Sequence, residues 1–148
     1  MQQLEITEIF HSIQGESTYS GLPCVFVRLS GCNLKCSYCD TCYSHEKGDV
    51  VGIEQILQKI DFYNCPLVEL TGGEPLLQEQ TPLLASRLLS KGYEVLVETN
   101  GSLDIDLLDK RCTRIVDVKC PGSGMSEKND FSNMKRLTKK DQLKFELS

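Results

Sequence analysis

The sequence predicts an α/β domain with parallel strands, and three observations support this fold class. The 148 residues are enough for one domain with a single core. Strand-like and helix-like segments alternate along most of the chain. Segments of unusual composition follow several strands, where α/β folds place their ligand sites. We therefore expect one domain over residues 1–148, with the carboxyl ends of its parallel strands on one side of the sheet.

The first half of the chain contains segments typical of strands and of one helix. Apolar residues dominate LEITEIF and CVFVRLS, which favours strands over residues 4–10 and 24–30. The apolar residues of IEQILQKIDF recur at helical spacing, which predicts a helix over 53–62. The apolar run LVEL then predicts a strand over 67–70.

The second half repeats this alternation. TPLLASRLLSKG predicts a helix over 81–92, with Thr81 as its N-cap, Pro82 at its first position and Gly92 at its end. The further expected elements are a strand over 93–99, a short helix over 104–110, a strand over 114–119, a helix near 132–140 and a strand over 142–147. Because helices separate most of these strands, we expect them to pair in parallel.

Charge and hydropathy narrow the classes of function. The chain has 21 acidic and 16 basic residues, so its net charge of −5 creates no field that attracts nucleic acid or anionic lipid. No signal-like start is present, and no apolar run approaches the roughly 20 residues that span a bilayer. We expect a cytoplasmic protein with a small-molecule ligand, without nucleic-acid or membrane partners. A basic run near the end is expected to form a solvated helix face, and it comprises Lys135, Arg136, Lys139, Lys140 and Lys144.

Four of the eight cysteines crowd into GCNLKCSYCDTC, residues 31–42. Eight cysteines are heavy usage for a cytosolic chain unless some bind metal, because a reducing compartment keeps structural disulfides rare. The other four lie singly beside apolar segments and are expected to be buried thiols: Cys24, Cys65, Cys112 and Cys120.

The crowded cysteines allow more than one kind of site. A disulfide framework needs an oxidising compartment, and a four-cysteine zinc site usually uses two well-separated pairs. A ferredoxin pattern continues with a fourth cysteine and a proline, where this chain reads YSHEKG. A further possible site is a four-iron cluster held by Cys32, Cys36 and Cys39, in which one iron is left free for a ligand. A non-catalytic zinc or electron-transfer module that also uses Cys42 remains an alternative.

Four unusual segments end predicted strands and should meet at one rim of the sheet. The cysteine loop follows 24–30, TGGEP (71–75) follows 67–70, ETNG (98–101) ends the strand over 93–99, and DVKCPGSG (117–124) ends the strand over 114–119. Because parallel strands place their carboxyl ends together, the cysteines are expected to belong to a ligand site.

The spacing C-x3-C-x2-C, with Tyr38 before the last cysteine and GGEP after a later strand, resembles the radical S-adenosylmethionine superfamily. The resemblance implies a [4Fe–4S] cluster on Cys32, Cys36 and Cys39, whose free iron binds S-adenosylmethionine. It also implies that reductive cleavage of this cofactor starts radical chemistry, while the protein positions the reactants and excludes water. Gly72 and Gly73 would let the backbone approach the cofactor closely.

A longer similarity narrows the family. EIFHSIQGESTYSGLPCVFVRLSGCNLKCSYCDT, ELTGGEPLLQ, VLVETNGS and VDVKCPGSG together resemble the 7-carboxy-7-deazaguanine synthases over most of residues 6–124. This resemblance implies a partial, reduced (β/α) barrel and a carbon–nitrogen lyase of queuosine and 7-deazapurine biosynthesis. The implied reaction contracts the ring of 6-carboxy-5,6,7,8-tetrahydropterin with loss of ammonia and uses Mg²⁺.

Site residues follow from this resemblance, position by position. The residues implied to bind the pterin substrate are Ile13, Gln14, Gly15, Arg28 and Thr71. Those implied to bind S-adenosylmethionine are Tyr38, Cys39, Asp40, Gly73, Asp117, Val118 and Lys119, with Glu74 and Glu98 as additional neighbours. Thr41 corresponds to the magnesium position. No side chain is assigned as a catalytic acid or base, and His11 and His45 are expected to be structural or surface residues.

The resemblance also implies partners, and the sequence departs from the family pattern in two places. The implied partners are an electron donor such as flavodoxin or ferredoxin and a second copy in a homodimer. Cys42 is an extra cysteine beside the cluster, and the chain ends at QLKFELS, where the family normally adds another helix and strand. A glycyl-radical activating enzyme, which acts on a protein partner, shares the cysteine spacing and is the nearest alternative enzyme.

Overall fold

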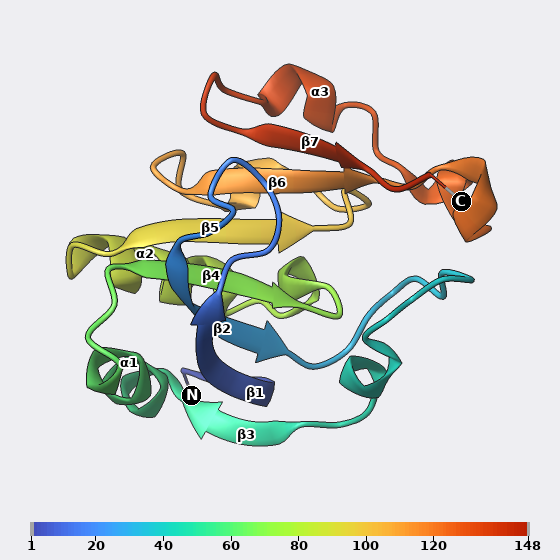
Figure 1. The fold of residues 1–148 in the computed structure, drawn as a ribbon. Coiled ribbons are helices and arrows are strands. Elements are labelled where there is room, and N and C mark those ends of the chain that lie inside the picture. Colours follow the sequence, from blue (N-terminus) through green and yellow to red (C-terminus); the bar gives the residue numbers. More distant parts are fainter. Residues whose placement is uncertain (1, 148) are drawn as a thin grey trace.

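The computed structural model describes residues 2–147, whose seven strands form one curved, open sheet (Figure 1). The strands are β1 (Gln3–Ile13), β2 (Pro23–Leu29), β3 (Asp49–Gly52), β4 (Leu67–Gly72), β5 (Glu94–Thr99), β6 (Thr113–Val118) and β7 (Gln142–Phe145). Their order across the sheet is β3-β1-β2-β4-β5-β6-β7. Strands β2, β4, β5, β6 and β7 pair in parallel, so their carboxyl ends share one rim.

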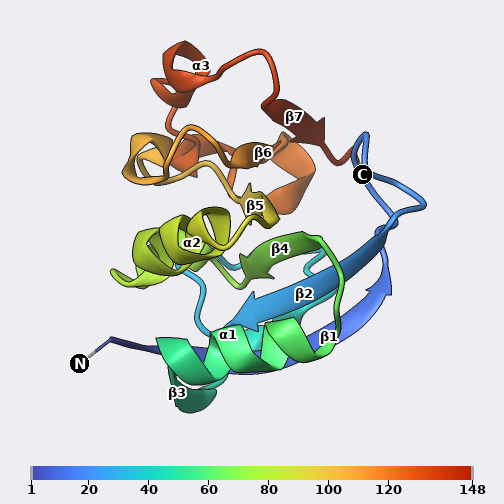
Figure 2. The same ribbon diagram turned by 90° about the vertical axis from the view of Figure 1, so that its left-hand side faces the viewer.

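Helices cover one face of this sheet. Figure 2 shows α1 (Ile53–Phe62) and α2 (Thr81–Ser90) on the same side of the strands, with the short α3 (Asn133–Arg136) beyond them. The buried faces of α1 and α2 pack on alternate residues of the central strands to form the main core, which includes Ile56, Ile60, Leu84, Leu88, Val27, Val68 and Val97. None of the helices described in residues 2–147 has the length and apolar character needed to cross a membrane.

The opposite face of the sheet is concave and carries the other set of alternating residues. A smaller apolar cluster covers its floor and consists of Cys24, Phe26, Leu67, Leu96 and Ile115, with Phe10 and Tyr19 packed against it. Side chains nearer the carboxyl ends of the same strands are polar. The period of two therefore builds a core on one face and an open site on the other.

The fold class is confirmed, and the strand arrangement adds two features that the sequence did not predict. Strand β1 pairs antiparallel with both β2 and β3, so the sheet is mixed rather than wholly parallel. Strand β3 has four residues, half-buried or exposed, and such a short edge segment has no alternation to detect. Because no helix separates β1 from β2, a loop returns the chain beside itself.

Several predicted helices are shorter in the structure. The segment 104–110 forms only a 3₁₀ turn at Ile105–Leu107, and the helix near 132–140 is restricted to α3. Helix α2 begins at Thr81 with Gln80 as its N-cap, because the Thr81 hydroxyl donates to the carbonyl of Pro75 at 2.6 Å instead of capping the helix. The basic run is also divided: Lys144 lies on β7 and not on a solvated helix face.

A buried arginine holds the last strand in place. Arg114 on β6 is fully buried, and its Nη2 donates to Asp141 Oδ2 at 2.7 Å and to the carbonyl of Arg136 at 2.6 Å. The backbone N–H of Arg114 donates to Asp141 Oδ1 at 2.8 Å. Asp141 directly precedes β7, so this pairing fixes the strand that carries Lys144.

Candidate active site

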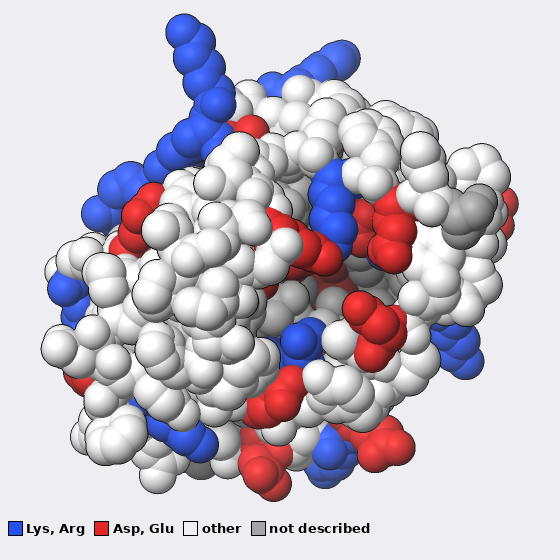
Figure 3. Space-filling view, viewed as in Figure 1, with Lys and Arg blue, Asp and Glu red and all other residues white. Residues whose placement is uncertain are grey.

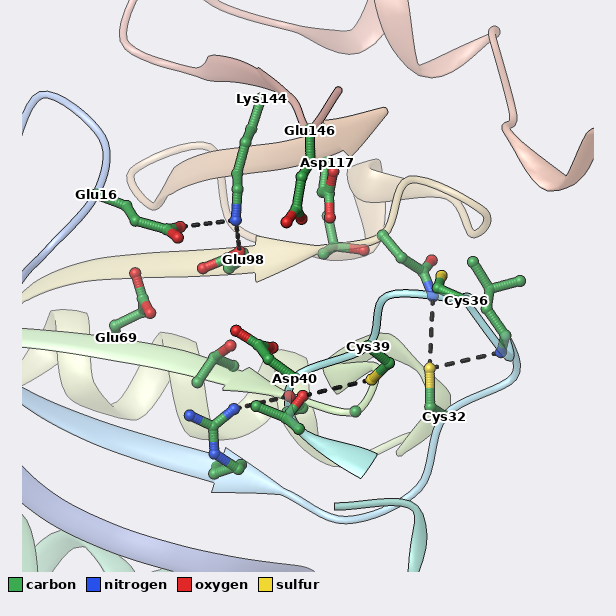
Figure 4. Close-up of a pocket in the computed structure, with 18 of the residues that line it drawn as sticks. Glu16, Cys32, Cys36, Cys39, Asp40, Glu69, Glu98, Asp117, Lys144 and Glu146 are labelled. Atoms are coloured by element: carbon green, nitrogen blue, oxygen red, sulfur yellow. Dashed lines mark hydrogen bonds and ion pairs between the residues drawn. The ribbon is translucent and has the colours of Figure 1, made fainter. Parts of the chain in front are cut away.

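A cavity of about 370 Å³ opens at the rim where the parallel strands end. The space-filling view shows it as a hollow bordered by both acidic and basic side chains (Figure 3). Its lining comes from β1 and the loop after it, from β2, β4, β5, β6 and β7, and from the cysteine loop, and Figure 4 shows many of these side chains around the cavity. The alternation of strands and helices predicted that the segments after the strands meet at one rim of the sheet, and the structure confirms this.

Three cysteines of the loop line this cavity, and the fourth does not. Cys32, Cys36 and Cys39 are half-buried, and all eight cysteines are free thiols. The Cys32 sulfur accepts from the Leu34 N–H at 3.5 Å, and Cys39 lies 3.8 Å from His45 Nε2. Cys42 is exposed, and its thiol donates to the carbonyl of Cys39 at 3.2 Å.

The residues present fit an iron–sulfur cluster on this loop. Three thiols face one cavity, and two N–H donors, from Leu34 and Asn100, approach the Cys32 sulfur, as in other cluster sites. Within residues 2–147, no three His, Cys, Asp or Glu side chains converge closely enough to hold a single metal ion. A four-iron cluster binds each thiolate at a different iron, so its cysteine ligands do not need to meet at one point.

The glycines of TGGEP bring β4 into contact with the cysteine loop. The Gly73 N–H donates to Ser44 Oγ at 2.8 Å, and the Glu74 N–H donates to the carbonyl of Gly31 at 2.8 Å. A Cβ atom on Gly73 would lie 1.8 Å from that carbonyl oxygen. Only glycine therefore allows this approach.

A cationic group lies on the β2 side of the cavity. Arg28 is held by hydrogen bonds from Nε to Glu8 at 2.8 Å and from Nη1 to the carbonyl of Gly72 at 2.9 Å, and its guanidinium lies over the Tyr43 ring. Burial opposes ionisation of Glu8, but hydrogen bonds from Tyr43 and Arg28 hold the pKa of this carboxyl below its usual value. Among residues 2–147, these bonds use Nε and Nη1, so Nη2 remains available to a ligand carboxylate.

An ion-paired lysine lies on the opposite side of the cavity. Lys144 Nζ contacts Glu16 Oε2 at 2.7 Å and Glu98 Oε1 at 3.0 Å, as Figure 4 shows. Burial disfavours the charge of Lys144, but Glu98 and Glu16 outweigh it and raise the lysine pKa. Burial likewise raises the pKa of Glu98, and Lys144 opposes this shift.

A second ion pair, between Lys119 and Asp117, lies at the carboxyl end of β6 and also lines the cavity. Lys119 Nζ contacts Asp117 Oδ2 at 2.6 Å, while Asp117 Oδ1 is buried and has no hydrogen-bond partner within the described residues. Burial disfavours the charge of Lys119, but Asp117 outweighs it and raises the lysine pKa. Asp117 Oδ1 is therefore a free acceptor at the edge of the cavity, which suits a ligand with hydroxyl or amino donors.

Most of the site residues that the sequence predicted lie together in this cavity. They are Gln14, Gly15, Arg28, Cys32, Cys36, Tyr38, Cys39, Asp40, Thr41, Thr71, Gly73, Glu98, Asp117 and Lys119. Ile13 ends β1, is 58% exposed as a residue and is not in the lining. Val118 points to the helix-covered face, because successive residues of a strand alternate, so only its backbone could face a ligand. Glu74 is fully buried and accepts hydrogen bonds from Leu76, Thr99 and Asn100.

The cavity also contains residues that sequence reasoning missed. Glu69 lies two residues before Thr71 on β4, so strand alternation places both on the same face and could have identified Glu69. Glu16, Lys144 and Glu146 also line the cavity. No spacing links Lys144 to the other motifs, and its position depends on the pairing of β7 with β6. His45, which was expected to be a structural or surface residue, is half-buried and also belongs to the lining.

Three of the four isolated cysteines are buried as expected. Cys24, Cys65 and Cys112 are packed in the interior, and burial raises the pKa of Cys24 to about 12 and that of Cys112 to about 11. Cys120 is only half-buried, and its thiol donates to the carbonyl of Val118 at 3.7 Å. The prediction of a buried thiol is therefore wrong for Cys120.

Comparisons with known proteins agree with this arrangement. The model of the radical SAM superfamily matches residues 26–118. The chain is 48% identical over 130 residues to a 7-carboxy-7-deazaguanine synthase of Chlorobaculum tepidum, covering 88% of this chain and 59% of that protein. It is 39% identical over 141 residues to the protein of the same name from Thermoplasma acidophilum, covering 94% and 68%.

A solved structure shares the fold, and the chain matches part of each curated relative. The crystal structure of QueE from Escherichia coli superposes with a TM-score of 0.74 at 20% identity, over 98% of this chain and 84% of the other. At that identity the likeness concerns the fold alone. The chain spans between 46% and 68% of the length of the curated relatives it matches.

Proposed function

The chain belongs to the radical S-adenosylmethionine superfamily and, within it, to the family of 7-carboxy-7-deazaguanine synthases, and we propose that it has their activity. The substrate would be 6-carboxy-5,6,7,8-tetrahydropterin, and the chain would act as a carbon–nitrogen lyase in queuosine and 7-deazapurine biosynthesis. One observation carries the proposal: a single cavity contains three free cysteines at one end and the immobilised Arg28 at another. Such a site can hold a redox cluster and a carboxylate-bearing ligand together.

Cys32, Cys36 and Cys39 would hold the [4Fe–4S] cluster. When bound with S-adenosylmethionine, this cluster supplies one-electron chemistry that no side chain can provide. The chain would hold the cofactor through the segments around Tyr38 to Asp40, Gly73 and 117–119. The free acceptor Asp117 Oδ1 would take a hydrogen bond from it, and the contact between Gly73 and Gly31 would keep the two loops at a fixed separation.

Arg28 would bind the substrate carboxylate. Its guanidinium is already oriented by Glu8 and Gly72, so little side-chain entropy is lost on binding. Thr71 pairs with Arg28 across β2 and β4 and would offer a hydroxyl to the same ligand. Gln14 and Gly15, on the loop after β1, would contact the pterin from the other side.

The cofactor set is proposed to include Mg²⁺ at Thr41. Thr41 lines the cavity, with its hydroxyl 3.8 Å from the Cys39 sulfur. Mg²⁺ keeps several waters and takes few protein oxygens, so one hydroxyl together with a substrate carboxylate would be sufficient.

The assembly and location of the protein are proposals too. We propose one radical S-adenosylmethionine domain over residues 1–148, supported by the single continuous sheet of the described residues. A homodimer is part of the proposal, and it rests on the resemblance to the family. An electron donor such as flavodoxin or ferredoxin would supply the electron. Eight free thiols fit a reducing compartment and hence the cytoplasm.

The test is an anaerobic assay with reconstituted cluster, reductant, Mg²⁺, S-adenosylmethionine and 6-carboxytetrahydropterin. Mass spectrometry should detect 7-carboxy-7-deazaguanine, and an Arg28→Met variant should lose most of this product while it still binds iron. A matched control is Arg87→Met, since Arg87 lies on α2 and pairs with Glu54 away from the cavity. Cofactor cleavage without deazaguanine in the unmodified chain would contradict the proposed substrate.

A further inference from the structure

Glu69 is a carboxyl group set into an apolar row on the floor of the cavity. Across the sheet it pairs with Phe26 of β2 and with Leu96 of β5, both of which belong to the apolar cluster of the concave face. Its side chain is buried, with a residue exposure of 3%. An aliphatic residue would complete this row at lower cost, because burying a carboxyl is unfavourable without full hydrogen bonding. The position therefore calls for a functional explanation.

Only one oxygen of this carboxyl has a hydrogen-bond partner within the described residues. Gln14 Nε2 donates to Glu69 Oε1 at 2.7 Å, and this is the hydrogen bond that residues 2–147 provide to the side chain. Glu69 lines the main cavity, and Figure 4 shows its carboxyl directed into the space between Glu16 and Glu98. The second oxygen is therefore available to a ligand.

The charged groups around Glu69 favour its neutral form. Glu98 on β5 and Glu16 on the loop after β1 repel a charge on Glu69, while Lys144 on β7, which is paired with both, attracts it and offsets the repulsion only in part. Cys24 on β2 also faces it, but as a neutral thiol. Burial raises the pKa of Glu69 to about 8, and Glu98 adds to this shift. At neutral pH the group is thus a carboxylic acid with an O–H donor.

We propose that Glu69 is a specificity-determining residue that donates a hydrogen bond from its neutral carboxyl to an acceptor on the heterocyclic ring of the substrate. Gln14 holds the other oxygen and so aims the O–H into the cavity. The proposal rests on the proposed function, because a pterin ring offers a carbonyl oxygen and ring nitrogens as acceptors. Arg28 then binds the carboxylate of the substrate and Glu69 hydrogen-bonds to its ring. These two contacts, at opposite ends of the ligand, fix its orientation.

The experiment measures the affinity of the reconstituted, S-adenosylmethionine-bound protein for 6-carboxytetrahydropterin by calorimetry from pH 6.5 to 9.5. Unmodified protein should bind progressively more weakly above about pH 8, by up to tenfold per pH unit. Glu69→Gln keeps a neutral N–H donor at every pH. Its affinity for the pterin should therefore not fall above pH 8. Glu69→Leu should bind about tenfold more weakly at pH 7, since it leaves the ligand acceptor unpaired.

Controls separate this inference from folding and from the proposed function. Glu94→Gln makes the same change on β5 at a site where the carboxyl accepts from Tyr19 and does not line the cavity, so it should retain the unmodified pH profile. Thermal unfolding should show Glu69→Leu to be at least as stable as the unmodified chain, which excludes misfolding as the cause.

Three results would decide the matter. If the unmodified chain binds the pterin and Glu69→Gln shows the same pH profile, Glu69 is structural and the inference fails alone. If Glu69→Leu binds as tightly as the unmodified chain, the inference likewise fails alone. If the unmodified chain binds S-adenosylmethionine but no pterin, the proposed function fails, and the inference fails with it.

Discussion

Cys42 and the three cavity cysteines differ in environment although they are close in sequence. Cys32, Cys36 and Cys39 line the cavity, whereas Cys42 begins the 3₁₀ turn η1 (Cys42–His45) and is exposed. The geometry supports a cluster held by three thiolates and leaves Cys42 outside the ligand set. It also makes the four-cysteine module a testable alternative.

The prediction at this scale concerns iron content. Cys42→Ser should retain the iron and acid-labile sulfide of the unmodified protein after anaerobic reconstitution, while Cys36→Ser should lose most of both, because a cluster needs each of its thiolate ligands. Iron and sulfide assays, with electron paramagnetic resonance after reduction, measure the outcome. Equal losses in the two variants would favour the four-cysteine alternative.

At the scale of elements, the site depends on how closely β4 approaches the cysteine loop. The segment that follows β4 hydrogen-bonds to Gly31 and to Ser44 of η1, and this fixes the floor of the cavity beside the cysteines. The two contacts join residues that are 43 positions apart (Glu74 and Gly31) and 29 positions apart (Gly73 and Ser44) in the chain. Local sequence cannot show them, although the pair of glycines in TGGEP is consistent with them.

Gly73→Ala should therefore destabilise the protein by about 1–3 kcal/mol, since its Cβ would overlap the Gly31 carbonyl oxygen, a backbone atom that cannot move freely. Urea unfolding followed by circular dichroism measures the change. Gly15→Ala is the matched control, because no atom lies within 4 Å of its added Cβ and its φ is not positive. A Gly73→Ala variant as stable as the control would show that the loops separate at little cost.

The predictability of the elements follows their length and environment. Helix α1 was predicted with its observed bounds, Ile53–Phe62, because its apolar residues recur over ten positions. Strand β3 was missed because it is a short edge strand. Helix α3 was overestimated because the carbonyl of Arg136, at its end, is bound by Arg114, a residue 22 positions earlier in the chain.

At the scale of the whole molecule, buried carboxyls make stability depend on pH. Burial raises the pKa of Glu69 to about 8 and raises those of Glu74 and Glu98, so the folded state binds these protons more tightly than the unfolded chain. Their contribution to stability is greatest below about pH 4.5 and falls as pH rises toward 8. Asp141 behaves oppositely: burial opposes its ionisation, but Arg114 lowers its pKa, and its contribution is lost in acid.

The cluster-free chain should therefore be most stable near pH 4, losing stability below that pH through Asp141 and above it through the buried glutamates. Between pH 4.5 and 8 the loss attributable to Glu69 has a limit of about 1.4 kcal/mol per pH unit. Thermal unfolding from pH 3 to 9 measures the profile, and Glu69→Gln should flatten it on the alkaline side. A melting temperature that stays constant from pH 5 to 8 would contradict the raised pKa of Glu69. So would a Glu69→Gln variant whose melting temperature falls with pH as steeply as that of the unmodified chain.

The sequence by itself determined the α/β class, the convergence of the motifs on one rim, the cysteine spacing and most of the residues that line the cavity. These features follow from local periodicity and from the rule that parallel strands end on the same side. Only the tertiary structure decided that Lys144 pairs with Glu16 and Glu98, that Glu69 lies in an apolar row, and that Cys42 lies outside the cavity. The physical reason is that cross-strand register and loop closure join segments distant in the chain, and local spacing does not encode which side chains these contacts bring together.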